Sequence, residues 1–131
     1  MKINREAAVK ILLNSHAGFK KHWDEHLEFW EGDEPGITND LSVYVGYVVD
    51  LVLSKNLVEL AVASEIIEHL IVEGDEDVLY GATIGYLEGI TNSLSHKEDK
   101  HTSLFNSYLK PRSREFCKEL DKFWGTNRLD V

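Results

Sequence analysis

Apolar residues recur at spacings of three and four along nearly the whole chain, which is the pattern of amphipathic helices. In residues 19–30 the side chains of Phe19, Trp23, Leu27 and Trp30 form one apolar stripe, which predicts a helix with one buried face. Residues 31–36 combine glycine, proline and acids. That composition predicts an exposed loop after the helix.

Residues 41–53 are apolar almost all round, and thirteen residues are long for a strand, so we predict a central buried helix. A second helical face follows in residues 57–71. Gly74 occupies the position of a left-handed helix C-terminus, and Asp75 that of an N-cap. The two-residue connection predicts antiparallel helices on either side of it.

Gly81, Gly85 and Gly89 are spaced by four in the helix that opens at Asp75. Glycine inside a helix costs about 0.5–1 kcal/mol relative to alanine, so three on one face require a reason. A face without side chains lets another backbone approach closely. We favour a neighbouring helix of the same domain over a partner protein.

The C-terminal part predicts a solvated connection over residues 95–101 and a short helix near residues 104–109. Pro111 stands near the start of a last helix, and Gly125 closes it. The whole chain, residues 1–131, is therefore predicted to be one compact all-α domain. We expect six or seven antiparallel helices arranged as HEAT-like hairpins, although no repeat of fixed period is present.

The composition fits a globular protein, because 43% of the 131 residues are hydrophobic and can supply a core. Cys117 is the single cysteine, which agrees with a reducing compartment. No apolar run is long enough for a membrane span, and the first residues lack the features of a secretory signal. We expect a cytoplasmic protein.

Charge is unevenly distributed along the chain. Between His22 and His96 there are sixteen Asp or Glu residues and one cation, Lys55, whereas the formal net charge of the chain is −9. Such a field repels nucleic acid and membrane phosphates and attracts basic surfaces. We therefore expect a basic protein partner, with no direct binding of nucleic acid or membrane.

The most enzyme-like motif is His22–Trp23–Asp24–Glu25–His26, which matches the H-x-x-E-H pattern of inverted zinc peptidases. In that reading His22 and His26 would bind zinc and Glu25 would act as the base. Three fixed positions without a third ligand are weak support, and shielding of a core edge explains the histidines equally well. We expect no catalytic residue, no metal and no cofactor, and keep a metal-dependent hydrolase as the third interpretation.

Two stretches carry a family resemblance: Gly74–Val78 leading to Leu87–Asn92, and Pro111–Cys117 leading to Phe123–Gly125. They resemble small bacterial all-helical immunity proteins of contact-dependent and polymorphic toxin systems. The resemblance implies an inhibitor that protects its producer from one cognate toxin. The glycines at positions 81, 85 and 89 depart from that family's pattern, in which other small or apolar residues are usual.

The acidic charge suggests the kind of toxin, because a nuclease cleft binds phosphates through basic residues and a carboxylate-rich face can cover it. A ribonuclease is the first choice, and the oligomeric state is left open. The predicted partner-binding residues are Trp30, Asp33, Glu34, Glu68, Glu73, Asp75, Glu76 and Asp77. The alternative is a HEAT-like helical adaptor that binds a basic protein other than a toxin.

Overall fold

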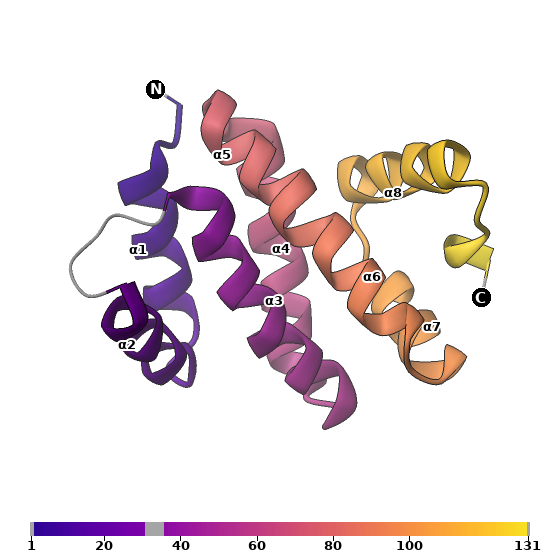
Figure 1. Ribbon diagram of the computed structural model, residues 1–131, viewed down its shortest axis with the longest axis horizontal. Helices are drawn as coiled ribbons and strands as arrows, with labels where there is room; N and C mark the ends of the chain where they lie inside the picture. Colours follow the sequence, from indigo (N-terminus) through magenta and orange to yellow (C-terminus); the bar gives the residue numbers. More distant parts are fainter. Residues whose placement is uncertain (1, 31–35, 131) are drawn as a thin grey trace.

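The computed structural model describes residues 2–30 and 36–130, and Figure 1 shows an arrangement built of helices. The elements are α1 (Arg5–Ser15), α2 (Phe19–Trp30), α3 (Ile37–Leu53), α4 (Leu57–Glu73), α5 (Glu76–Tyr80), the π-helical segment η1 (Gly81–Glu88), α6 (Gly89–Ser95), α7 (Asp99–Ser107), α8 (Pro111–Trp124) and the 3₁₀ turn η2 (Arg128–Asp130). Because α5, η1 and α6 follow one another without a break, they form one long helix. Counted in this way, the described residues hold seven helices and a 3₁₀ turn, which confirms the predicted all-α fold.

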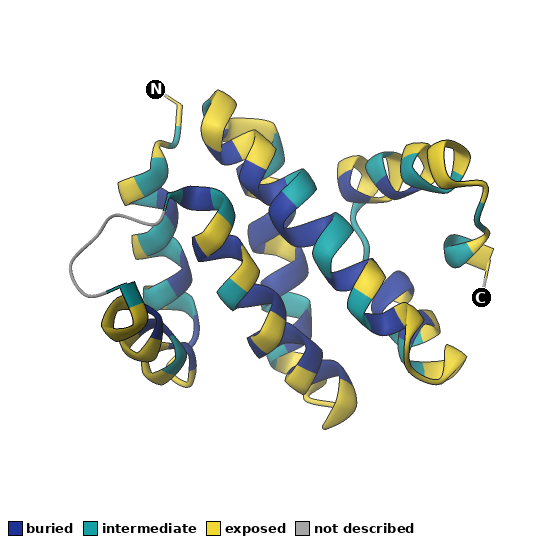
Figure 2. Cartoon of the chain, viewed as in Figure 1, coloured by how far each residue is buried: buried dark blue, intermediate teal, exposed yellow. Residues whose placement is uncertain are grey.

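Helix α3 is the centre of the molecule, as the sequence predicts. Ten of its residues are buried, and Tyr44, Val48 and Val52 have no exposed surface. Figure 1 shows α3 between α1 and α2 on one side and the long α5–η1–α6 helix on the other, with α4 behind it. Figure 2 shows that burial is concentrated in these central helices, whereas α8 is exposed along much of its length. The helix begins four residues earlier than predicted, at Ile37.

The three spaced glycines face α3, which confirms internal packing as their role. A Cβ atom at Gly85 would lie 3.1 Å from the Thr38 carbonyl oxygen. At Gly81 it would lie 3.1 Å from the Ile37 side chain, and at Gly89 3.3 Å from that of Val45. The long helix is π-helical over Gly81–Glu88, which includes two of the three glycines, a feature that the spacing of apolar residues does not predict.

The amphipathic helix α2 forms as predicted, but its buried face is rotated from the predicted stripe. Phe19, Trp23 and His26 are buried, whereas Leu27 is exposed and Trp30 is half-buried. A histidine takes the place of a leucine because a buried carboxylate lies opposite it, as described below. The apolar stripe therefore placed Leu27 in the core, where the structure has His26.

Two further predictions about local structure are wrong. Gly74 has φ −71° and lies in the extended region, not the left-handed one. It is glycine because a Cβ atom would lie 2.6 Å from Val78 Cγ1. The second error concerns the length of the predicted solvated connection: residues 96–98 link α6 and α7 and are exposed as expected, but α7 already begins at Asp99.

The ends of α8 agree with the prediction: Pro111 is in the first turn, and Gly125 has φ 65°, in the left-handed region.

Within the part of the chain that the structure covers, no helix combines the length and apolar composition needed to cross a bilayer.

Candidate functional site

Many of the acids between His22 and His96 are engaged inside the domain. Those with an intramolecular cation, histidine or helix terminus as partner are Asp24, Asp40, Glu59, Glu65, Glu68 and Asp75. The surface available to a basic partner is therefore smaller than the charge count suggests.

Glu68, a predicted partner-binding residue, stabilises the beginning of α8. Its carboxylate accepts hydrogen bonds from the backbone N–H groups of Arg112 and Ser113, both at 2.9 Å, and from the Ser113 hydroxyl at 3.0 Å. The first N–H groups of a helix have no partner within the helix, and an anion there also interacts favourably with the helix dipole. The structure thus gives Glu68 a role within the fold.

Asp75 is the N-cap of α5, as the sequence predicts, because the Val78 N–H donates to its carboxylate at 2.9 Å. The turn is also held by the N-terminal segment. The backbone N–H of Ile3 donates to the Glu73 carbonyl, and the Asp75 N–H donates to the Ile3 carbonyl, both at 2.8 Å. Residues 2–4, which belong to a cationic part of the sequence, therefore lie beside the acidic turn between α4 and α5.

Three predicted acids remain free of ion pairs with other described residues: Glu73, Glu76 and Asp77, all exposed. Tyr80, which is 56% exposed, follows Glu76 and Asp77 at spacings of four and three, so the three side chains share one face of the helix. Val72, at the end of α4, is also exposed. We call Val72, Glu73, Glu76, Asp77 and Tyr80 the acidic turn patch.

Tyr80, the aromatic member of this patch, was not predicted. It lies in a run of apolar residues, a pattern that indicates a buried side chain. Trp30, the predicted aromatic anchor, is half-buried and contacts the ring of His26 at a centroid distance of 6.3 Å. Its neighbour Phe29 is exposed instead. Asp33 and Glu34 lie outside the described residues, so the structure does not place them.

The histidines of the H-x-x-E-H motif have different surroundings. His26 Nε2 lies 3.0 Å from Asp40 Oδ1, and Arg5 Nε donates to Asp40 Oδ2 at 2.8 Å. Asp40 is fully buried, so this network joins α1, α2 and α3. His22 instead packs against the rings of Phe19 and Tyr47. Among the residues described, no three His, Cys, Asp or Glu side chains are arranged to hold a metal ion.

A second buried histidine, at the end of α1, links α1 to α3 and α4. His16, which has no exposed surface, hydrogen-bonds the Glu59 carboxylate through Nδ1, and its Nε2 lies 2.6 Å from the Tyr44 hydroxyl. Burial raises the pKa of Tyr44 well above its usual value. The hydroxyl therefore keeps its proton, which it can donate to His16. The trio has the composition of a catalytic relay, but a substrate cannot reach His16, so we assign it to the packing of α1 against α3 and α4.

An apolar groove separates α8 from the long helix. It has a volume of about 560 Å³ and is lined by Ile84 and Glu88 from the long helix and by Phe116, Glu119, Leu120, Lys122, Phe123 and Trp124 from α8. The groove was not predicted, because it depends on how far α8 stands from η1. It is considered separately below.

Comparison with known proteins gives one match. A family model described as a domain of unknown function, DUF7674, matches residues 9–125. No curated protein and no solved structure matches the chain. Since the match covers most of the chain, this protein belongs to the family of DUF7674 domains.

Proposed function

We propose that this protein is an immunity protein that binds and neutralises a cognate nuclease toxin by covering its basic active-site cleft. A ribonuclease is the first toxin to test. The observation that supports the proposal most is the acidic turn patch, in which Glu73, Glu76 and Asp77 are exposed beside the exposed ring of Tyr80.

Carboxylates that form no ion pair with other described residues can attract a basic cleft over a distance, which raises the rate of association. Affinity in protein interfaces comes mostly from a few aromatic or arginine anchors that are surrounded by polar residues. Tyr80 beside Glu76 and Asp77 has this composition. The patch therefore offers both properties that a fast and tight inhibitor needs.

The structure changes which acids we assign to the interface. Glu68 and Asp75 have roles inside the fold, so a substitution there would alter stability as well as binding. The proposed interface keeps Glu73, Glu76 and Asp77 from the predicted set and adds Tyr80. The carboxylates would occupy the positions at which the nuclease holds substrate phosphates.

The test uses the triple variant E73K/E76K/D77K and the toxin domain obtained by coexpression with the reading frame beside this gene. We expect the association rate constant at low salt to fall at least about tenfold, because steering is lost. A control variant, E98K/D99K/E115K, makes the same change in net charge at exposed positions on α7 and α8. It should reduce the rate far less.

Two outcomes would contradict the proposal. If the two triple variants associate equally fast, the acidic turn patch is not the contact surface. If the chain binds a basic protein from the neighbouring gene without inhibiting any nuclease activity, the adaptor interpretation replaces the immunity interpretation.

A further inference from the structure

The C-terminal end of α8 exposes two adjacent aromatic side chains beside the apolar groove. Phe123 is 78% exposed and Trp124 is 57% exposed, and both form part of the groove wall together with Ile84 and Leu120. Exposed aromatic residues next to an apolar groove are typical of a protein-protein interface.

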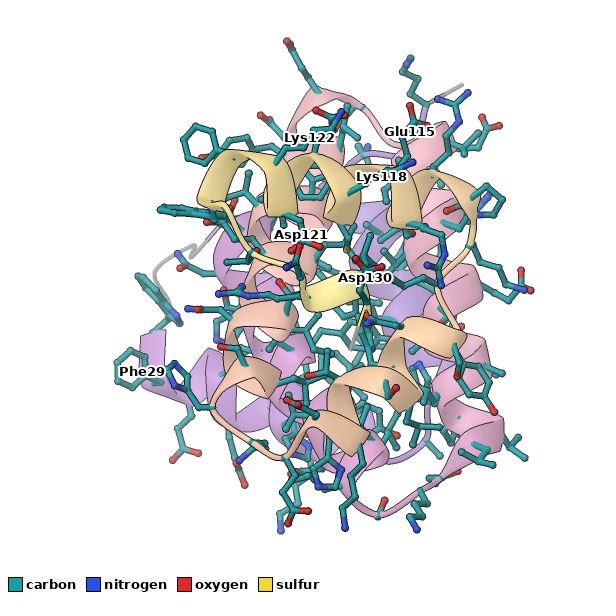
Figure 3. The ribbon with its side chains drawn as sticks, turned by 90° about the vertical axis from the view of Figure 1, so that its right-hand side faces the viewer. Phe29, Glu115, Lys118, Asp121, Lys122 and Asp130 are labelled. Carbon is teal, nitrogen blue, oxygen red and sulfur yellow. The ribbon has the colours of Figure 1, made fainter. Side chains whose placement is uncertain are left out.

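The charge near the groove differs from that of the rest of the molecule. Helix α8 contains four Arg or Lys residues and three Asp or Glu residues, whereas the whole chain has a net charge of −9. Figure 3 shows Glu115, Lys118 and Lys122 along the outer side of α8, with both signs close together. Lys122 also lies 3.7 Å from Glu119 in an ion pair. A basic partner would thus gain little at this surface, and an acidic one would be repelled by the remainder of the chain.

We propose that the groove binds Phe123 of a second copy of this chain, so that the protein forms a symmetric homodimer through α8. In a twofold dimer each copy gives the same surface, so one aromatic side chain and one groove per copy complete two equivalent contacts. The near-neutral α8 is also the part of an acidic protein on which two copies repel each other least. The acidic turn patch is not part of this interface.

The size of the contact predicts a weak dimer. From the area of an aromatic side chain, Phe123 and Trp124 together offer roughly 300 Å² per copy. Because both rings also form part of the groove wall, their area is counted once, and the total for two copies is below about 1,200 Å², in the range of weak and transient contacts. We therefore expect reversible association at concentrations near millimolar.

The test is sedimentation equilibrium of the whole chain at concentrations up to about 1 mM. Phe123→Ser should raise the dimer dissociation constant at least about thirtyfold, because the twofold symmetry removes the contact twice. Phe29→Ser is the matched control: Phe29 is 80% exposed, on α2, and Figure 3 shows it away from α8. Its dissociation constant should equal that of the unmodified chain. Circular dichroism checks that both variants remain folded.

Three results would overturn the proposal. The first is a monomer at every concentration, and the second is a dimer that Phe123→Ser does not weaken. The third is a loss of toxin binding in Phe123→Ser while the unmodified chain alone stays monomeric, which would make the groove a partner site. Because sedimentation equilibrium needs no toxin and the association-rate assay tests the acidic turn patch, either proposal can fail without the other.

Discussion

Alanine substitutions at Gly85 and Gly46 should change stability in opposite directions, although both glycines lie inside helices. At Gly85 the added Cβ atom would lie 3.1 Å from the Thr38 carbonyl oxygen and 3.4 Å from Leu41 Cβ. One neighbour is backbone, so the long helix must move away from α3. Overpacking of this kind costs about 1–3 kcal/mol, of which the better helix propensity of alanine recovers up to about 1 kcal/mol. Gly85→Ala should therefore destabilise the protein by about 1 kcal/mol, and by no more than about 2 kcal/mol.

Gly46 is the control, because it is exposed on α3 and its Cβ atom would meet nothing within 4 Å. Only the helix propensity and the smaller entropy of the unfolded chain act there, so Gly46→Ala should stabilise by about 0.5–1 kcal/mol. The assay is guanidinium denaturation followed by circular dichroism, with the unfolding midpoints compared. Equal stability of Gly85→Ala and the unmodified protein would refute the close-approach explanation, as would a destabilised Gly46→Ala.

Further predictions concern Glu68 and Asp40, two acids with partners inside the fold, and the thiol of Cys117. Glu68→Ala should lower the free energy of unfolding by about 1–2 kcal/mol, because the start of α8 loses its capping carboxylate, whereas Glu65→Ala, at an exposed ion pair, should stay within about 0.5 kcal/mol. Asp40→Ala removes the buried carboxylate that pairs with Arg5 and hydrogen-bonds His26, and should cost about 2–4 kcal/mol, against no more than about 0.5 kcal/mol for the exposed Asp50→Ala on the same helix. Burial, with a smaller contribution from a nearby carboxylate, raises the pKa of Cys117 to about 12, so its reaction with a disulfide reagent at pH 8 should be roughly a thousandfold slower in the folded protein than in denaturant. Because the folded protein favours the protonated thiol, the contribution of Cys117 to the free energy of unfolding is complete below pH 9 and is lost as the pH rises toward 12. In that range the free energy of unfolding of Cys117→Ala should therefore depend less on pH than that of the unmodified protein.

The fold follows from the sequence where the residue pattern is local. Three-and-four spacing identifies α2, and the length of the apolar run identifies α3. Asp75 and Pro111 begin helices and Gly125 ends one, as expected. The spaced glycines predict a close approach to a neighbouring helix, although not that this helix is α3. These features depend on neighbours within a few turns, which is the range that periodicity reports.

What the sequence could not predict depends on contacts between distant residues. Whether Glu68 faces solvent or α8 is decided 44 residues further along the chain, at Arg112. His26 is buried because Asp40 is buried beside it, and neither position is expected in a core. Gly74 is required by lack of space for a Cβ atom and not by its backbone angle. For the same reason the charge count overestimated the free acidic surface, since pairing inside the fold is not visible in composition.

Hydrogen exchange of the protein with and without its toxin domain tests the central claim most directly. The account predicts new protection in residues 72–80, which carry the acidic turn patch. It also predicts that protection in α8 is unchanged when toxin is added. Protection confined to residues 97–124, with exchange at residues 72–80 unchanged, would contradict the account.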